Sequence, residues 1–374
     1  MVTSPRLFLI FALLSTYSAE ARGARSGDTS WIRQYIAGLR QSQALPSLRS
    51  DRRIDRAARL NSRAVAEIDG ELPTGAESYL RFQLQRHGVV DAVQHAWVVR
   101  FRPGAVGRAR LRSSIERQVQ GSWSHMGMGV HRRDKGEHIA TIILTRRLVH
   151  VRRRGPRLCV RALRGHRPRL WFTTPSGRVV AGGGTNSRRL CRKLPNQGPG
   201  RYEVEVMVDG RFGPEVAALF PIYLGQPAPS APVTRLYPPG ERSPQRAESR
   251  LLALINAARE KAALAPLRMD QELAAAARAH SNDMRRMGFF GHRSPRWGSL
   301  AARLASRGIR VIEASENLAL SSSARRAHDR LMASPAHRRV ILDGSLSHVG
   351  IGVVVQEATG LLYITQCFTR HAEK

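Results

Sequence analysis

The sequence predicts an α+β protein in three parts, with two related mixed domains on either side of a strand-rich domain. Three observations lead to this prediction. A pattern near the amino end recurs near the carboxyl end, apolar residues change from helical spacing to alternation in the middle, and a stretch rich in Pro, Ser and Ala precedes the second copy. A chain of 374 residues is also too long for one ordinary core.

The first 21 residues have the pattern of a secretory signal. Arg6 is followed by an apolar run at residues 7–14 and by the small-x-small site Ala19-Glu20-Ala21. The run is too short to span a bilayer, no cysteine lies near the cleavage site, and no later segment approaches membrane-spanning length. We therefore expect residues 1–21 to be removed and the protein to be secreted or periplasmic, without a membrane span.

The formal net charge of +33 comes almost entirely from arginine. Arginines are scattered through every segment, and the only lysines are Lys135, Lys193, Lys261 and Lys374. A bias in overall composition explains this better than a dedicated nucleic-acid site, because no nucleic-acid-binding motif accompanies the charge. We expect no specific nucleic-acid partner. Weak, salt-sensitive attraction to anionic surfaces follows from the charge, and an Arg-rich binder of anionic polymers is the weakest functional alternative.

The internal repeat begins with a pair of helices in each copy. In the first copy, helical spacing covers residues 31–40 and 52–68, and Asp51 precedes the second helix as Asp270 does in the later copy. Further aligned pairs are Ile36 with Ile255, Arg40 with Arg259, Leu48 with Leu267, Ile54 with Leu273, and Ser62 with Ser281.

The repeat resumes where GSWSHMGMGV at residues 121–130 matches GSLSHVGIGV at residues 344–353. One domain type is therefore predicted twice, at residues 28–147 and 246–374. The copies differ in their polar residues: Asn61 takes the place of His280, and neither His292 nor His337 has a histidine counterpart. We expect the first copy to be degenerate and to serve structure or interaction.

Residues 148–225 predict a small β-sandwich. Short strand-like runs at residues 158–163, 169–173 and 178–180 are broken by turn residues, and Asp209-Gly210 is a hairpin signal. Residues 226–245 are predicted as a semi-extended linker. The clearest strand alternates Tyr202, Val204, Val206 and Val208 with Arg201, Glu203, Glu205 and Met207.

Two of the three cysteines lie in this strand-rich segment. In an oxidising compartment Cys159 and Cys191 could pair, which would leave Cys367 odd. The alternative is that all three are small buried apolar residues.

The second copy mixes helices with antiparallel strands. Asp270 has the chemistry of an N-cap for a helix whose apolar stripe includes His280. Ser334 and Pro335 suit the N-cap and first residue of a helix that carries His337. Alternating apolar residues then predict strands at residues 349–353 and 362–368, so this copy is expected to be layered α+β.

An ordered set of motifs in the second copy resembles the CAP superfamily of cysteine-rich secretory, antigen 5 and pathogenesis-related proteins. The resemblance covers the second copy closely and the first in outline. Its features, after Ile255-Asn256 and His280-Ser281, are GFFGHRSP at residues 288–295, ENLA at 316–319, SPAHR at 334–338 and VGIG at 349–352.

The resemblance implies a three-layer αβα sandwich with a cleft that holds two histidines and acidic partners and can bind a divalent metal. It assigns His292 and His337 as metal ligands and adds Glu316 to the ligand-binding set. The position of the second acid falls near Ser334, so Asp329, the nearest acid, completes the predicted set. Two imidazoles with a carboxylate suit Zn²⁺, although structural hydrogen bonding is the alternative role.

The leading functional hypothesis is a secreted protein that binds a lipid, glycan or protein ligand in this cleft, possibly with zinc. The alternative is a metal-assisted hydrolase, protease-like, that uses the same cleft. Other polar residues are expected to be structural. His280 lies on an apolar stripe, His348 recurs as His125 in the first copy, and Ser294 lacks the turn and the third member of a catalytic triad. Arg338 is expected to pair with a local acid.

Overall fold

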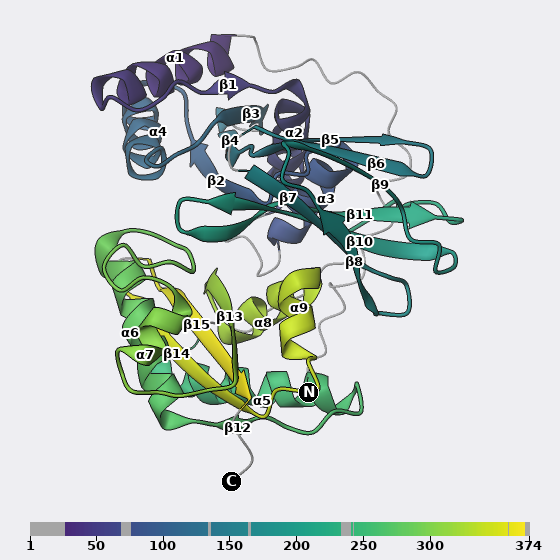
Figure 1. Cartoon of the computed structure of the whole chain (residues 1–374). Helices are drawn as coiled ribbons and strands as arrows, with labels where there is room; N and C mark the ends of the chain where they lie inside the picture. The colour runs from purple at the N-terminus through teal and green to yellow at the C-terminus, as the bar shows by residue number, and fades with distance from the viewer. Residues whose placement is uncertain are drawn as a thin grey trace, which may run out of the picture.

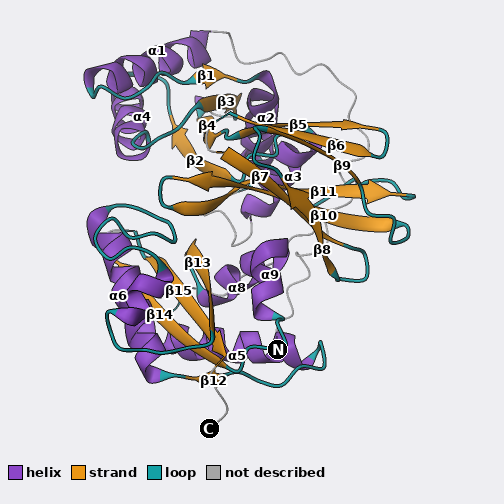
Figure 2. Ribbon diagram, viewed as in Figure 1, coloured by secondary structure: helices purple, strands orange, loops and turns teal. Residues whose placement is uncertain are grey.

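The computed structural model describes residues 27–68, 76–133, 136–163, 166–232, 241, 243–357 and 359–370. The predicted signal and residues 233–240 of the predicted linker lie outside these ranges. Helices and strands occur together in both outer parts of the chain, and the middle consists of strands (Figures 1 and 2). The predicted α+β class is confirmed. Within the described ranges, no helix is both long and apolar enough to cross a bilayer.

We call residues 27–146 the amino-terminal domain, residues 149–224 the β-domain and residues 244–370 the carboxyl-terminal domain. The carboxyl-terminal domain begins two residues before its predicted start, because Ser243 caps a helix whose first residue is Pro244. The amino-terminal domain contains α1 (Gly27–Ser42), β1 (Arg49–Ser50), α2 (Arg52–Ala66), α3 (Ala76–Arg86), β2 (Val93–Phe101), α4 (Ala105–Gln118), β3 (His125–Arg132) and β4 (His138–Arg146).

The two outer domains contain sheets of the same topology. The strand orders are β1-β3-β4-β2 and β12-β14-β15-β13. In each sheet the short first strand is parallel to its neighbour and the other pairs are antiparallel. The carboxyl-terminal domain contains α5 (Pro244–Glu260), β12 (Arg268–Met269), α6 (Gln271–Met287), α7 (Leu300–Ala305), β13 (Glu313–Ser321), α8 (Ala324–Ala333), α9 (Pro335–Ile341), β14 (His348–Gln356) and β15 (Leu361–Arg370).

Alternation along β14 gives the carboxyl-terminal sheet two different faces. Val349, Ile351 and Val353 pack with Leu251 of α5 and with residues of α8 in one buried cluster. The intervening glycines face α6, which covers the opposite side. Helices on both faces make the three-layer αβα sandwich that was predicted.

The Gly-x-Gly motif of β14 lets α6 lie directly on the strand. A Cβ at Gly350 would lie 2.2 Å from the Leu273 carbonyl carbon, and one at Gly352 would lie 2.0 Å from the Arg278 nitrogen. No other residue can occupy these positions without moving the helix. Ser281 of α6 then fixes the contact, because its Oγ donates to the Gly352 carbonyl at 2.9 Å.

The same contact recurs in the amino-terminal domain. A Cβ at Gly127 would lie 2.5 Å from the Ile54 Cβ, and one at Gly129 would lie 2.2 Å from the Arg59 nitrogen. The Ser62 Oγ donates to the Gly129 carbonyl at 2.9 Å. The residues repeated in sequence are therefore those that hold helix and strand together.

A buried arginine joins helix ends to loops in both outer domains. Arg40 and Arg259 are each 1% exposed, and their guanidinium groups donate to backbone carbonyls. Each satisfies several carbonyls that would otherwise be buried without a partner. The acceptors are Pro46, Val119 and Gly121 for Arg40, and Ala265, Ile341, Asp343 and Leu346 for Arg259.

The β-domain is a sandwich of two antiparallel sheets, ordered β5-β6-β9 and β11-β10-β7-β8. Side chains from both sheets form one buried cluster, which includes Val160, Leu190, Phe172 and Val206. A disulfide joins Cys159 to Cys191 across neighbouring strands, and Cys367 is a buried free thiol. The strands are β5 (Val149–Arg154), β6 (Arg157–Ala162), β7 (His166–Thr173), β8 (Val179–Gly184), β9 (Arg189–Lys193), β10 (Gly200–Gly210) and β11 (Gly213–Leu224).

The polar face of β10 is covered by the carboxyl-terminal domain. Glu205 is fully buried; its Oε1 accepts a hydrogen bond from the Ser334 Oγ, and its Oε2 accepts one from the Ala336 N–H at 2.7 Å. These contacts lie at the start of α9, which packs against the β-domain (Figure 1). The guanidinium of Arg339 also stacks over the Trp171 ring at 5.3 Å. The alternation along β10 therefore marks two buried faces.

Replacing Gly352 with Ala is expected to destabilise the carboxyl-terminal domain by roughly 1–3 kcal/mol or more, because the new methyl group would overlap the α6 backbone. Urea unfolding of the full chain measures the effect. Gly38→Ala is the matched control: no atom lies within 4 Å of a Cβ at this position of α1, and the change should stabilise slightly. Equal stabilities for the two variants would contradict the proposed helix–strand contact.

The contribution of Glu203 and Glu205 to stability is expected to fall as the pH rises from about 4.5 to about 7, opposite to the contribution of the buried histidines His280, His328 and His337, whose pKa values are lowered. Burial raises the pKa of both Glu203 and Glu205 to about 7, so the folded protein holds protons that the unfolded chain releases. The stabilisation is complete below pH 4.5 and is lost as the pH passes 7. Each group contributes up to roughly 3 kcal/mol.

Urea unfolding at pH 5 and pH 8 checks this expectation. Glu205→Gln should raise the stability at pH 8 relative to that at pH 5, compared with the unmodified chain, because the amide does not titrate. The same change at Glu260, which is exposed on α5, should leave the difference as it is. An unaltered pH dependence in the Glu205 variant would refute the assignment.

Candidate functional site

His292 lies in the loop that follows α6. The helix ends at Gly288, whose left-handed conformation (φ 65°, ψ 30°) turns the chain into this loop. His280 of α6 holds the loop in place, because its Nε2 donates to the Gly291 carbonyl at 3.0 Å. Burial lowers the pKa of His280 to about 4 and keeps it neutral. His280 therefore has the structural role that its apolar stripe indicates.

Glu316 is fixed between a histidine and an arginine. It extends from β13, and its Oε1 lies 2.9 Å from the His292 Nδ1. Its Oε2 accepts from Arg303 of α7 at 2.7 Å, and the Glu316 and Arg303 side chains are only 3% and 2% exposed. Burial favours the protonated acid, but the His292 hydrogen bond and the Arg303 charge outweigh it and lower the pKa of Glu316. The carboxylate is therefore ionised.

This ionised carboxylate orients the His292 ring. A carboxylate accepts hydrogen bonds, so the proton on the ring lies on Nδ1 and faces Glu316. The Nε2 atom of His292 has no hydrogen-bond partner among the described residues, and the side chain is 26% exposed. A histidine held in this way by a buried acid presents a nitrogen to a ligand.

His337 lies across the site on α9. Its Nδ1 lies 2.5 Å from the Ser334 Oγ, and its carbonyl accepts from the Asn317 side chain of β13 at 3.2 Å. Burial, with a smaller contribution from the charge of His292, lowers the pKa of His337 to about 3. The Nε2 atom of His337 also lacks a partner within the described part of the chain. The structure thus brings together three of the four predicted residues: His292, Glu316 and His337.

The fourth predicted residue, Asp329, lies on α8 and pairs with Arg325 one turn away at 3.2 Å. Its place in the ligand site remains a prediction. The acid that approaches His337 through Ser334 is Glu205 of the β-domain. In the sequence, Glu205 is marked only by its place in the alternating pattern of β10. That pattern does not show which part of the chain covers Glu205.

Glu205 determines which nitrogen of His337 carries the proton. When Glu205 is ionised, the Ser334 hydroxyl donates to it and must accept from His337. The proton then lies on Nδ1 of His337, which leaves Nε2 with a lone pair. The β-domain therefore orients a residue of the carboxyl-terminal domain.

A second contact of the β-domain lies on the His292 loop. The Arg293 N–H donates to the Phe212 carbonyl at 2.8 Å, and the Phe212 and Phe289 rings lie 5.2 Å apart. A Cβ at Gly213 would lie 3.2 Å from the His292 Cβ. The turn between β10 and β11 therefore packs beside His292.

Two other expectations concern residues near the site. Ser294 donates to Asp283 at 2.6 Å and accepts two backbone N–H groups, so its hydroxyl stabilises a turn. The expectation for Arg338 was wrong. Its guanidinium donates to the Gly177 carbonyl of the β-domain at 3.3 Å, because α9 packs on that domain and not beside an acid.

The site offers a metal two nitrogen ligands. The Nε2 atoms of His292 and His337 have suitable chemistry, and both rings are held through Nδ1. Among the described residues, no three His, Cys, Asp or Glu side chains lie close enough to hold an ion. Remaining positions on a metal would therefore be filled by water or by a ligand.

Comparisons with known proteins identify this domain. Residues 252–368 match the family model for CAP, the cysteine-rich secretory protein family. YkwD of Bacillus subtilis (strain 168) is 37% identical over 108 residues, which cover 29% of this chain and 42% of YkwD. The membrane protein YlbC of the same organism is 36% identical over 107 residues, 28% of this chain and 31% of YlbC. The chain spans less than half the length of these curated relatives.

Among solved structures, an extracellular protein containing an SCP domain from Bacillus anthracis str. Ames is 20% identical, with a TM-score of 0.33 over 60% of this chain and 67% of that chain. The family match coincides with the domain that carries His292, Glu316 and His337. The carboxyl-terminal domain of this chain therefore belongs to the cysteine-rich secretory protein (CAP) family.

Proposed function

We propose that the carboxyl-terminal domain binds a glycan or protein ligand at the site formed by His292, Glu316 and His337. The observation that carries this proposal is the chain from Arg303 through Glu316 to His292. It buries an ionised carboxylate in order to hold one partly exposed imidazole in a fixed direction. Burying an ion pair costs free energy of desolvation. A buried carboxylate that orients a partly exposed imidazole is typical of histidines that bind a ligand, so this arrangement favours a binding role for His292.

The chemistry of the cleft favours a polar ligand. The Nε2 atoms of His292 and His337 are polar groups that could meet a ligand, while the side chains of Glu316 and Ser334 are buried and hold these rings in place. A lipid remains the third of the predicted ligand classes, and it receives less support from these residues. The site also lies where two domains meet, which is a common location for ligand sites.

We include a divalent metal in this proposal, with His292 and His337 as its protein ligands. When bound, zinc would polarise a ligand oxygen or lower the pKa of a bound water. His337 is neutral at pH 7 because its pKa is about 3, and its Nε2 carries the lone pair when Glu205, whose pKa is about 7, is ionised. This neutral imidazole also supports the second candidate function, a metal-assisted hydrolase that uses the same cleft.

We further propose that the protein acts outside the cytoplasm. The pattern of a secretory signal at residues 1–21 supports this location. The Cys159–Cys191 disulfide supports it independently, since such bonds persist in oxidising compartments.

Calorimetric titration of the full chain with zinc is expected to give close to one ion per chain. The double variant His292→Ala/His337→Ala should lose this binding, because it removes both nitrogen ligands. The matched control is His150→Ala, which changes an exposed histidine of the β-domain. Failure of the unmodified chain to bind zinc would overturn the metal proposal and, with it, the metal-assisted hydrolase.

An array of oligosaccharides and extracellular proteins tests the ligand. Saturable binding of the full chain should fall at least tenfold in the His292/His337 double variant and remain in His150→Ala. Ligand turnover that stops on chelation would favour the hydrolase instead. Binding that the double variant retains would show that the cleft is not the ligand site.

A further inference from the structure

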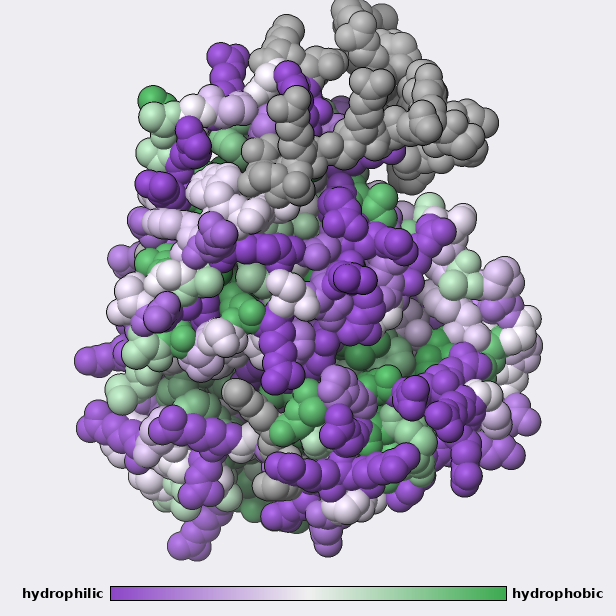
Figure 3. Space-filling model, turned by 90° about the horizontal axis from the view of Figure 1, so that it is seen from above, coloured by the Kyte–Doolittle hydropathy of each residue, from purple (hydrophilic) through white to green (hydrophobic). Residues whose placement is uncertain are grey.

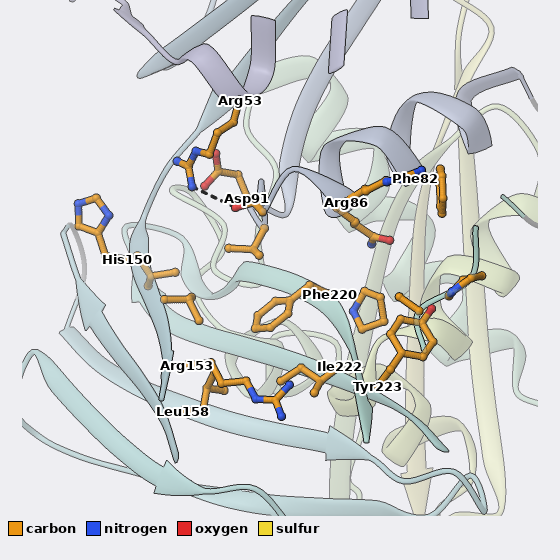
Figure 4. A pocket seen from close by; sticks show the side chains of 18 of the residues that line it. Arg53, Phe82, Arg86, Asp91, His150, Arg153, Leu158, Phe220, Ile222 and Tyr223 are labelled. Carbon is orange, nitrogen blue, oxygen red and sulfur yellow. Dashed lines mark hydrogen bonds between the residues drawn. The ribbon is translucent and has the colours of Figure 1, made fainter. Parts of the chain in front are cut away.

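A second cavity lies between the amino-terminal domain and the β-domain. Its volume is about 670 Å³, within the range typical of small-molecule sites. Residues at the start of α2 and the end of α3 line one side, and strands β5, β6 and β11 line the other. Figure 4 shows Arg53 and Arg86 on the helix side, Arg153 and Leu158 on the strand side, and Phe220 between them.

The floor of this cavity is apolar. Val149, Leu158, Phe220 and Ile222 belong to the core of the β-domain and also line the cavity. Tyr223, which is half-buried, adds an aromatic ring (Figure 4). The four core side chains are at most 8% exposed, so the apolar surface that an occupant would cover belongs to Tyr223 and to the other half-buried lining residues, Phe82, Val90 and Val151.

The cavity also carries excess positive charge. Arg147 pairs with Asp91 at 3.1 Å and with Asp51 at 2.8 Å, and Arg53 pairs with Asp51 at 2.8 Å. These four groups balance one another. Arg86 and Arg153 also line the cavity, and neither has a carboxylate partner in the described part of the chain.

A basic groove continues from the cavity along α2. Arg53 and Arg86 line both spaces, and the groove adds Arg52, Arg56 and Arg59. Among the described residues that line it, the acid is Asp55, whose charge is already balanced by Arg33 at 2.5 Å. When the molecule is seen from above, hydrophilic residues are prominent on this face, with apolar residues between them (Figure 3). Arg52, Arg56 and Arg59 have no acidic partner among the described residues.

The repeat provides an internal comparison for this arginine-rich surface. The equivalent positions in α6 are Gln271 for Arg52, Glu272 for Arg53 and Ala275 for Arg56. Arg278 is the equivalent of Arg59, and it is neutralised by Glu248 at 2.8 Å. A composition bias acts on both copies equally, so it does not explain why Arg52, Arg53 and Arg56 at the start of α2 have no arginine counterpart at the start of α6.

We propose that this cavity binds an anionic amphiphile with a phosphate head group and a single apolar chain. Arg86, which has no carboxylate partner among the described residues, stands beside the paired Arg53 where the basic groove meets the cavity, and a guanidinium group binds phosphate oxygens in a bidentate way. The apolar chain covers the half-buried side chains of Phe82, Val151 and Tyr223. A polyanion would use the groove but leave these three side chains partly exposed to water.

Calorimetry of the full chain with dodecyl phosphate, below the concentration at which it forms micelles, tests the proposal. One molecule should bind per chain, and inorganic phosphate and the uncharged dodecyl maltoside should each bind at least tenfold more weakly. Arg86→Ala should weaken binding roughly tenfold, through loss of a charge-assisted hydrogen bond. Arg110→Ala is the matched control, since this exposed arginine of α4 lines neither space.

Filling the cavity tests the position of the apolar chain. Val151→Trp on β5 and Gln85→Trp on α3 each place a large ring among the lining residues, and a thermal melt confirms that each variant folds. Both variants should weaken dodecyl phosphate at least tenfold. The proposal is overturned if binding persists in both folded variants, if Arg86→Ala binds as tightly as Arg110→Ala, or if inorganic phosphate binds equally well.

Discussion

The carboxylate of Glu205 is the group on which the arrangement of the candidate site depends. It belongs to the β-domain, yet its two oxygens accept hydrogen bonds from the Ser334 hydroxyl and the Ala336 N–H at the start of α9. Through Ser334 it reaches His337, so packing between domains and orientation of a ring in the cleft rest on one interaction. A loss of domain docking would release the imidazole at the same time. The carboxyl-terminal domain is therefore incomplete as a site when taken alone.

The two outer domains show how one frame carries different surfaces. The Gly-x-Gly strand, the serine that binds it and the buried arginine recur because they form the contacts between helix and sheet. Residues outside these contacts have diverged. The carboxyl-terminal copy carries His292 beside a buried Glu316, whereas the amino-terminal copy carries arginines along α2. In each copy the distinctive polar groups therefore lie at positions that do not take part in the shared contacts between helix and sheet.

Sequence patterns were sufficient where the determining contacts are local or repeated. The caps Asp270 and Ser334 followed from such patterns, whereas the αβα layers and the grouping of His292 with Glu316 and His337 followed from the family resemblance. Glu205 and Arg338 did not, because their partners belong to another domain and lie more than a hundred positions away in the chain. The cavity above β11 was equally out of reach, since its walls come from four separate stretches.

The disulfide of the β-domain has a consequence for the integrity of the chain. It joins residues 32 positions apart and encloses β7 and β8. Exposed residues within this loop include Pro175, Ser176 and Arg188, at turns where a protease can reach the backbone. A cut at any of these turns would leave the two chain segments covalently joined. The sheet that presents Glu205 would keep its strands in one molecule, and the nick would become visible only after reduction.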